Sequence, residues 1–279
     1  MGEARLYHTA TLLNSGKVLV TGGVNASFNT PASSEIYDPS MNQWNSAASM
    51  VTGRYYHTAT LLNSGKVLVT GGVNVSFNTL ASCEIYDASM NQWNSATSMA
   101  TARYDHTANV LSSGKVLVSV GFGSSAFLDS CEIYDASMNQ WNSAASVTTA
   151  RYEHTATLLN SGKVLVSGGE GWNDATGCEI YDPSTDQWNS AASMAIARVE
   201  HTASLLNSGK VLVTGGSGSI IGLASSEIYD PSMDQWNSAA SMITGRVFHT
   251  ATVINSGKVL VTGGVNASFY VTSSEIYNP

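Results

Sequence analysis

Apolar and polar residues follow one order along the chain and repeat it. Residues 54–72 read RYYHTATLLNSGKVLVTGG: an alternating segment, HTATLL, then a turn, NSG, then an apolar segment, KVLVTGG. After a variable loop come SCEIYD, a short turn and QWNSA. Alternation with a period of two and turns rich in Gly, Asn and Pro predict β-strands. Each repeat is therefore expected to form strands a (HTATLL), b (KVLVTGG), c (SSEIYD) and d (QWNSA), and no segment has a useful helical period.

The repeat length is set by residues that recur at 47 to 49 positions, namely His8, His57, His106, His154, His201 and His249. A strand-only repeat of this size cannot bury both its faces alone, but stacked repeats can. The pattern predicts an all-β protein, a six-bladed β-propeller forming a single domain over residues 1–279. Its blades are expected at approximately 1–53, 54–102, 103–150, 151–197, 198–245 and 246–279. The last repeat ends at SSEIYNP, so its blade is expected to lack the outer, tryptophan-bearing strand d.

Each repeat carries four motifs in a fixed order: Arg-x-x-His, a strand ending in Gly-Gly, Glu-x-Tyr-Asp and a Trp. This order resembles the kelch repeat, whose period is near 50 residues. The resemblance covers essentially the whole chain. Val120 departs from it, since it replaces the first glycine of the pair in the third repeat. The resemblance implies four-stranded propeller blades and a binding role, although some kelch proteins are enzymes.

Composition excludes several classes of function. Only 11% of the residues are charged and the formal net charge is −8, which argues against nucleic-acid binding. No apolar run approaches the roughly 20 residues of a membrane span, and no signal segment is visible at the start. We expect a soluble monomer without membrane or nucleic-acid partners, in a compartment that the sequence does not name. Cys83, Cys131 and Cys178 occupy equivalent positions in separate repeats, which suits buried structural residues better than disulfides or a metal cluster.

The residues that do not change between repeats are interpreted as scaffold. One arginine and one glutamate per repeat predict a repeated ion pair, because buried charges persist only when paired. Each histidine is expected to bond the backbone near the start of strand a, although a histidine metal ring is the alternative. Representative structural residues are listed here: Arg54, Glu84, His57, Gly71, Gly72 and Trp93. No catalytic motif is present, so no catalytic residue, no metal and no cofactor are predicted.

Variation between repeats concentrates in two places, the residues before each His and the loop after Gly-Gly. In an antiparallel a-b-c-d blade these d–a and b–c connections lie at the same end. The residue before each His changes most, in the order Tyr7, Tyr56, Asp105, Glu153, Glu200, Phe248. Around a ring this order predicts an aromatic arc from blades six, one and two and an acidic arc from blades three, four and five. Aromatic residues outside the scaffold also fall in these zones, Trp172 among them, and aromatic side chains are enriched where proteins bind partners.

The kelch resemblance implies further ligand contacts at two positions, the residue after Gly-Gly and the Ser two before the strand-c Glu. These map to Val73, Phe122 and Glu170, and to Ser82, Ser130 and Ser225. Kelch pockets for acidic peptides carry arginines before the His, and this chain has none there.

The leading hypothesis is a non-enzymatic binding module that uses the d–a and b–c loop face around the central opening. Its partner would be a protein or peptide with cationic or polar groups held between the two arcs. One alternative is a carbohydrate-binding or carbohydrate-active propeller, because exposed aromatics stack on sugars. Another is a structural or engineered repeat scaffold with no dedicated ligand.

Overall fold

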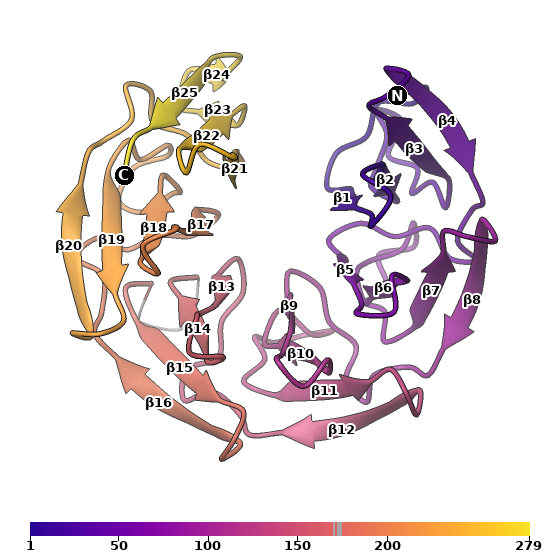
Figure 1. The fold of residues 1–279 in the computed structure, drawn as a ribbon, viewed down its shortest axis with the longest axis horizontal. Helices are drawn as coiled ribbons and strands as arrows, with labels where there is room; N and C mark the ends of the chain where they lie inside the picture. The colour runs from indigo at the N-terminus through magenta and orange to yellow at the C-terminus, as the bar shows by residue number, and fades with distance from the viewer. Residues whose placement is uncertain (170, 172–174) are drawn as a thin grey trace. The chain divides into compact units, whose positions relative to one another are not determined.

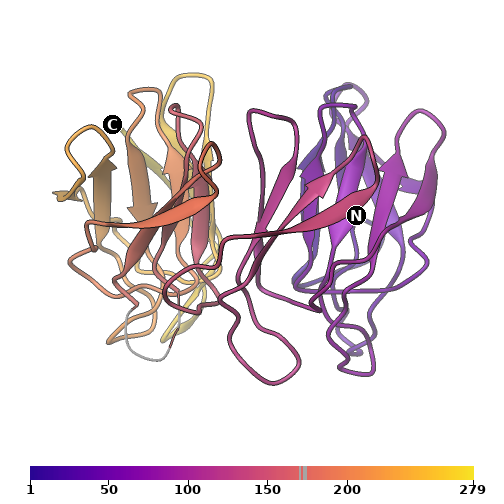
Figure 2. The same ribbon diagram turned by 90° about the horizontal axis from the view of Figure 1, so that it is seen from below.

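The computed structural model covers residues 1–279 and describes residues 1–169, 171 and 175–279. Contacts divide the chain into two compact units, Met1–Ala144 and Ala145–Pro279, and each unit is described by itself (Figure 1). In each unit the strands run side by side with their connecting loops at the two ends (Figure 2).

Every repeat folds into its own antiparallel sheet, here called a blade, with strands in chain order. In unit 1, blade 1 contains β1 (Thr9–Leu12), β2 (Val18–Thr21), β3 (Ser34–Asp38) and β4 (Gln43–Ala47). Blade 2 contains β5 (Thr58–Leu61), β6 (Val67–Thr70), β7 (Cys83–Asp87) and β8 (Gln92–Ala96). Blade 3 contains β9 (Thr107–Val110), β10 (Val116–Ser119), β11 (Cys131–Asp135) and β12 (Gln140–Ala144).

Unit 2 repeats the arrangement. Blade 4 contains β13 (Thr155–Leu158), β14 (Val164–Ser167), β15 (Cys178–Asp182) and β16 (Gln187–Ala191), and blade 5 contains β17 (Thr202–Leu205), β18 (Val211–Thr214), β19 (Ser226–Asp230) and β20 (Gln235–Ala239). Blade 6 contains β21 (Thr250–Val253), β22 (Val259–Thr262) and β25 (Ser274–Tyr277), beside a small hairpin of β23 (Val265–Asn266) and β24 (Phe269–Tyr270). In the described part of the chain blade 6 has no fourth strand, which confirms the expectation for the last repeat.

The burial of each strand follows its composition. Strand b is mostly apolar, and Val67, Leu68 and Val69 in β6 are fully buried. Strand a is the inner strand, since β1 packs against β5, β5 against β9, β13 against β17 and β17 against β21. Strand d is the outer strand and is largely exposed in blade 1. Hydrophobic burial therefore stabilises the faces between neighbouring blades, where strands b and c pack.

The expected ion pairs are present among the described residues of all six repeats. Arg54 Nη2 lies 3.0 Å from Glu84 Oε1, and Arg54 Nη1 donates to the carbonyls of Gly71 and Ser82 at 2.8 Å. The Glu84 carboxylate also accepts the N–H groups of Val51 and Thr52. The pair is buried and fully bonded, so it fixes the d–a loop against the ends of strands b and c.

The histidines connect blades, which the sequence did not predict. His8 Nδ1 lies 2.9 Å from the Arg5 carbonyl oxygen, as expected. However, His57 Nε2 lies 3.0 Å from the Thr9 hydroxyl of the preceding blade. His106, His201 and His249 make the same cross-blade contact. The backbone partner expected from the sequence is present at His8, and the contact with the hydroxyl of the preceding blade is an addition to it that the sequence did not indicate.

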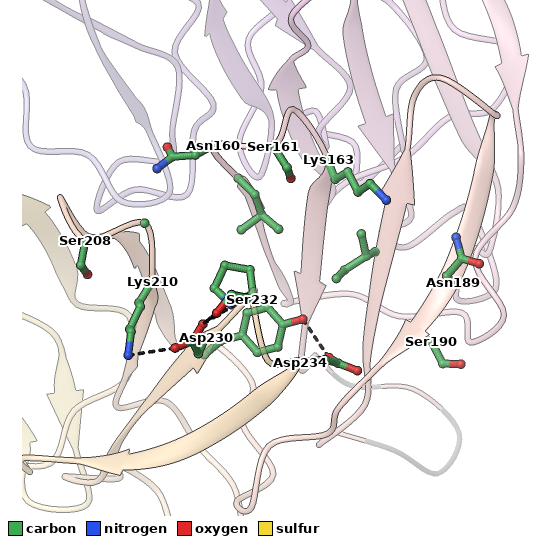
Figure 3. Close-up of a pocket in the computed structure, with 15 residues that line it drawn as sticks. Asn160, Ser161, Lys163, Asn189, Ser190, Ser208, Lys210, Asp230, Ser232 and Asp234 are labelled. Atoms are coloured by element: carbon green, nitrogen blue, oxygen red, sulfur yellow. Dashed lines mark hydrogen bonds and ion pairs between the residues drawn. The ribbon is translucent and has the colours of Figure 1, made fainter.

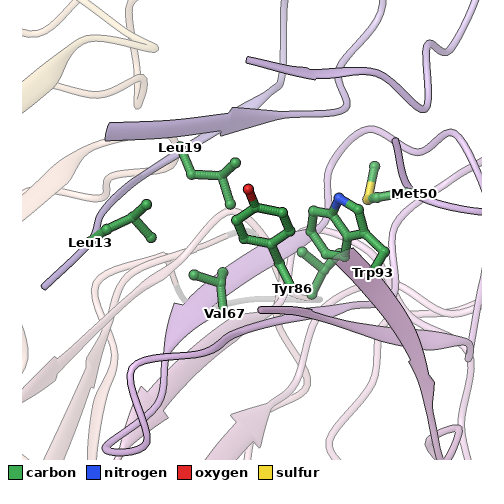
Figure 4. Packing of buried hydrophobic residues seen from close by; sticks show 7 residues of the cluster. Leu13, Leu19, Met50, Val67, Tyr86 and Trp93 are labelled. Carbon is green, nitrogen blue, oxygen red and sulfur yellow. The ribbon is translucent and has the colours of Figure 1, made fainter. Parts of the chain in front are cut away.

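Tryptophans pack at the same blade boundaries. Trp93 lies beside Tyr86, with ring centroids 5.1 Å apart, and Met50 of the preceding blade lies on its other side (Figure 4). Its indole N–H donates to the Ala48 carbonyl at 2.9 Å. Cys83 and Cys178 lie in the packed layers between blades, and Cys131 is buried as well.

Candidate functional site

The two variable zones lie at the same end of each blade. Tyr55, in the d–a loop, exchanges two backbone hydrogen bonds with Val73, in the b–c loop, at 3.0 and 2.9 Å. Equivalent bridges join Leu6 to Val24, Tyr104 to Phe122, Val199 to Ser217 and Val247 to Val265. The d–a and b–c loops of a unit therefore form one surface, here called the variable face.

The residue before each His has a left-handed backbone. Its φ is 53° at Tyr7, 55° at Tyr56, 47° at Asp105 and 54° at Glu153, Glu200 and Phe248. The residue before it is fixed by the bridge and the residue after it enters strand a, so the chain must turn within one residue. Glycine or asparagine would adopt this φ most easily, and other residues cost about 1 kcal/mol. The backbone conformation thus gives no reason for Tyr, Glu or Phe at these positions.

Unit 1 carries a continuous row of aromatic rings on its variable face. Tyr7 and Tyr56 have ring centroids 4.2 Å apart, and Tyr55 lies 5.0 Å from Tyr56. The row continues through Tyr56–Tyr104 at 6.0 Å, Tyr104–Phe122 at 5.4 Å and Phe122–Phe127 at 5.3 Å. We call Tyr7, Tyr55, Tyr56, Tyr104, Phe122 and Phe127 the aromatic row.

An acidic residue borders this row. Asp105 donates its backbone N–H to the Tyr56 carbonyl at 3.2 Å, which places it next to Tyr56. Burial raises the pKa of the Tyr55 hydroxyl, and the negative charge of Asp105 contributes in the same direction. Tyr7 is 40% exposed at one end of the row. Polarisable ring faces beside a carboxylate are suited to a cation.

Unit 2 places two carboxylates in succession beside an aromatic residue. Glu200 donates its backbone N–H to the Glu153 carbonyl at 3.1 Å, and Phe248 donates to the Glu200 carbonyl at 3.4 Å. Phe248 is 47% exposed. The sequence candidates Glu170 and Trp172 lie outside the described residues.

The serines implied by the kelch resemblance have partners inside the blade. The hydroxyls of Ser82, Ser130 and Ser225 accept hydrogen bonds from the buried arginine of their own repeat at 2.9 to 3.2 Å. Each hydroxyl keeps its proton for a further acceptor. Val73 is only 6% exposed, so little of its side chain is open to a ligand.

The opposite ends of the blades carry grooves that sequence reasoning missed. One, of about 840 Å³, lies between blades 4 and 5, and an equivalent groove of about 600 Å³ lies between blades 1 and 2. Figure 3 shows the first, where Lys210 pairs with Asp230 and the Tyr229 hydroxyl donates to Asp234. The sequence feature that could have indicated these grooves is the set of exposed Asn and Ser residues that recur unchanged in the turns, such as Asn160 and Ser161.

The described residues offer little for metal or thiol chemistry. Within the described ranges, no three His, Cys, Asp or Glu side chains gather closely enough to hold a metal ion. Burial raises the pKa of Cys83 and Cys178 to about 12, so these thiols stay protonated at neutral pH. No helix among the described residues has the length and apolar character needed to cross a membrane.

Antiparallel four-stranded blades that pack through their inner strands define a β-propeller. Comparison with family models then gives the family. The model of the KLHDC2/KLHL20/DRC7 Kelch-repeats domain matches residues 7–216, and the Kelch motif matches residues 201–243. The chain therefore belongs to the kelch-repeat family.

A solved structure supports the same fold. The solved structure described as "Structure of YjhT" is similar to this chain with a TM-score of 0.76 and 16% sequence identity, over 98% of this chain and 97% of the other. At this identity the similarity concerns the fold alone, which is all-β and a six-bladed β-propeller. The comparison with curated proteins gave no match.

Proposed function

We propose that the chain is a non-enzymatic binding module whose variable face binds a protein or peptide with cationic groups. Kelch propellers are commonly protein-interaction modules, which agrees with the general role. The aromatic row beside Asp105 is the observation that carries the proposal. Rings and carboxylates together attract guanidinium and ammonium groups and provide no comparable interaction for anions.

The left-handed backbone at the changing positions supports the same proposal. These residues have φ values near 50° that bulky side chains adopt only at a cost. Positions under no functional demand would be filled better by Gly or Asn. Glu153 and Glu200 in unit 2 extend the acidic character to further blades.

A peptide array tests the proposal directly. The protein is applied to arrayed peptides that are arginine-rich, lysine-rich, neutral or glutamate-rich, and we expect binding to the basic sets. Tyr56→Ala or Glu153→Lys should reduce that binding at least about tenfold without changing the circular dichroism spectrum. Met90→Lys, at an exposed turn at the other end of blade 2, is the matched control and should bind normally.

Three results would reject the proposal. Preference for glutamate-rich peptides would contradict the charge argument. Unchanged affinity after joint charge reversal of Asp105, Glu153 and Glu200 would remove the acidic residues from the site. Selective binding on a glycan array with no peptide binding would favour the carbohydrate alternative.

A further inference from the structure

The two grooves at the ends of the blades opposite the variable face are built from one set of residues. Fifteen residues line the groove between blades 4 and 5 in unit 2, and residues at the same repeat positions line the groove between blades 1 and 2 in unit 1. The two sets differ where Pro231 and Asp234 of blade 5 correspond to Ala88 and Asn91 of blade 2. Volumes of about 840 and 600 Å³ lie in the range of sites that hold small ligands. We call them the inter-blade grooves.

Both blades contribute to the lining of an inter-blade groove (Figure 3). In unit 2, blade 4 provides Asn160 from its a–b turn and the neighbours Asn189 and Ser190 from β16. Blade 5 provides residues of its a–b and c–d turns. Ile180, half-buried on β15, and Pro231 add apolar surface to the same groove. Amide and hydroxyl groups therefore lie beside apolar surface.

The polar side chains of strand d have no evident role within the fold. Asn189 and Ser190 are exposed, and in the described part of the chain their side chains make no hydrogen bond. Asn is depleted in β-strands, so strand formation does not account for its presence. The same Asn-Ser pair occupies β4, β8, β12, β16 and β20, whereas the residue before each His changes from repeat to repeat. This contrast favours a function for the exposed polar residues of the grooves.

The charges that line the groove are already paired within the protein. Lys210 Nζ lies 2.9 Å from Asp230 Oδ2. The Asp234 carboxylate accepts the Tyr229 hydroxyl at 2.8 Å. In the groove of unit 1, the uncharged Asn91 accepts the equivalent hydrogen bond at 2.9 Å, so the two grooves share the hydrogen bond and not the charge. Exposed ion pairs contribute little net attraction for a further ion, and we expect a neutral ligand.

We propose that the inter-blade grooves bind neutral sugar residues of a carbohydrate chain. A sugar ring carries hydroxyl groups around its edge and C–H groups on its faces. The side chains of Asn160 and Asn189 both donate and accept hydrogen bonds to such hydroxyls, and Ile180 contacts the C–H groups. The site is separate from the variable face and independent of the peptide-binding proposal.

The repetition of the grooves determines how such a ligand is held. Each unit has an inter-blade groove with nearly the same lining, so one chain binds several sugar residues of a polymer whose own units repeat. Linked sites raise the affinity for the polymer above that of one groove, because the second contact is intramolecular. We therefore expect weak binding of short sugars and stronger binding of polysaccharides.

Affinity electrophoresis of the 279-residue protein tests the proposal. Native gels contain a soluble glucan, mannan, galactan or xylan as neutral probes, or polygalacturonate or heparin as charged probes. At least one neutral polysaccharide should retard the protein, and the charged ones should not. Absence of retardation by every neutral polysaccharide, or retardation by the charged ones that is equal or stronger, would overturn the proposal.

Substitutions in strand d locate the site. Asn189→Ala should lower the affinity for the retarding polysaccharide about tenfold, and the double variant Asn45→Ala/Asn189→Ala about a hundredfold, because each change weakens one groove. Met233→Ala is the matched control, since this residue is 64% exposed in the same turn as Asp234 but lies outside the groove lining, and it should bind normally.

Circular dichroism of these variants checks folding, which substitutions at exposed residues should leave intact. Unchanged affinity of the double variant would place the sugar outside the inter-blade grooves and refute the proposal. Loss of binding in Tyr56→Ala with normal binding in the double variant would assign the sugar to the variable face, which also refutes it.

Discussion

The first glycine of each Gly-Gly pair is expected to control how closely neighbouring blades approach. Gly71, at the end of β6, has a φ of +62°, and the next residue, Gly72, donates its N–H to the Arg103 carbonyl of blade 3 at 2.8 Å. The substitution Gly71→Ala tests this expectation. Its control is Gly263→Ala in blade 6, where φ is +69° and a Cβ would meet no described atom within 4 Å.

The expected cost follows from the geometry. A Cβ on Gly71 would lie 2.3 Å from the Arg103 carbonyl oxygen and 2.8 Å from His106 Cε1. Relief to a carbon–oxygen distance of about 3.3 Å needs a shift of roughly 1 Å between blades. That shift stretches the Gly72 hydrogen bond and loosens the packing, which costs about 2–4 kcal/mol, and the left-handed backbone adds about 1 kcal/mol. Gly263→Ala carries only the last cost.

Urea denaturation followed by circular dichroism measures both variants. We expect Gly71→Ala to lower the free energy of unfolding by about 3–5 kcal/mol and Gly263→Ala by about 1 kcal/mol. Equal losses would refute the steric argument, because the two sites share their backbone conformation and differ mainly in what a Cβ would meet.

Three further predictions concern charge and hydrogen bonding. Burial lowers the pKa of His57 to about 3, so below pH 6.5 the imidazole takes up a proton in the unfolded chain but not in the folded protein. The free energy of unfolding should therefore be highest above pH 6.5 and fall by about 2 kcal/mol per such ring at pH 5. Urea midpoints that do not change with pH would contradict this. Glu84→Ala leaves the Arg54 charge buried without its partner and should lower the free energy of unfolding by about 3–5 kcal/mol. Asp87→Asn removes one partner of a surface ion pair and should change the urea midpoint little. Similar losses of stability in the two variants would refute this distinction between buried and surface pairs. Trp93→Phe removes the donor to Ala48 and should cost about 1 kcal/mol in the same assay, and no loss would show that the bond does not stabilise the fold.

The sequence predicted the interior of a blade well. Strand order, the turns and the Arg54–Glu84 pair depend on a period that the chain repeats, and the structure has them as expected. The direction of the strands alone also predicted that both variable zones lie at the same end of a blade. These features need only residues close in sequence or equivalent within one repeat.

Contacts between blades were predicted poorly. The His57–Thr9 contact and the two hydrogen bonds accepted by Asn91 join residues from neighbouring repeats. Their geometry depends on the offset between blades, which no local pattern encodes. The left-handed backbone at Tyr56 was also missed, because Tyr gives no hint of a positive φ.

The constancy of strand d has a consequence for folding kinetics. The sequence QWNSA is identical in β4, β8, β12, β16 and β20. The side chains of strand d therefore do not distinguish the strand d of one repeat from that of another as a partner for strand c. Only chain connectivity favours the correct partner. The turn between β7 and β8 has four residues, whereas pairing β7 with the strand d of the next repeat would close a loop about one repeat longer. The entropic cost of closing the short turn is lower by about 2 kcal/mol. The turn that ends at Asn91 therefore selects correct strand pairing against exchange between blades, and slowing its closure should populate strand-exchanged, misfolded chains during refolding.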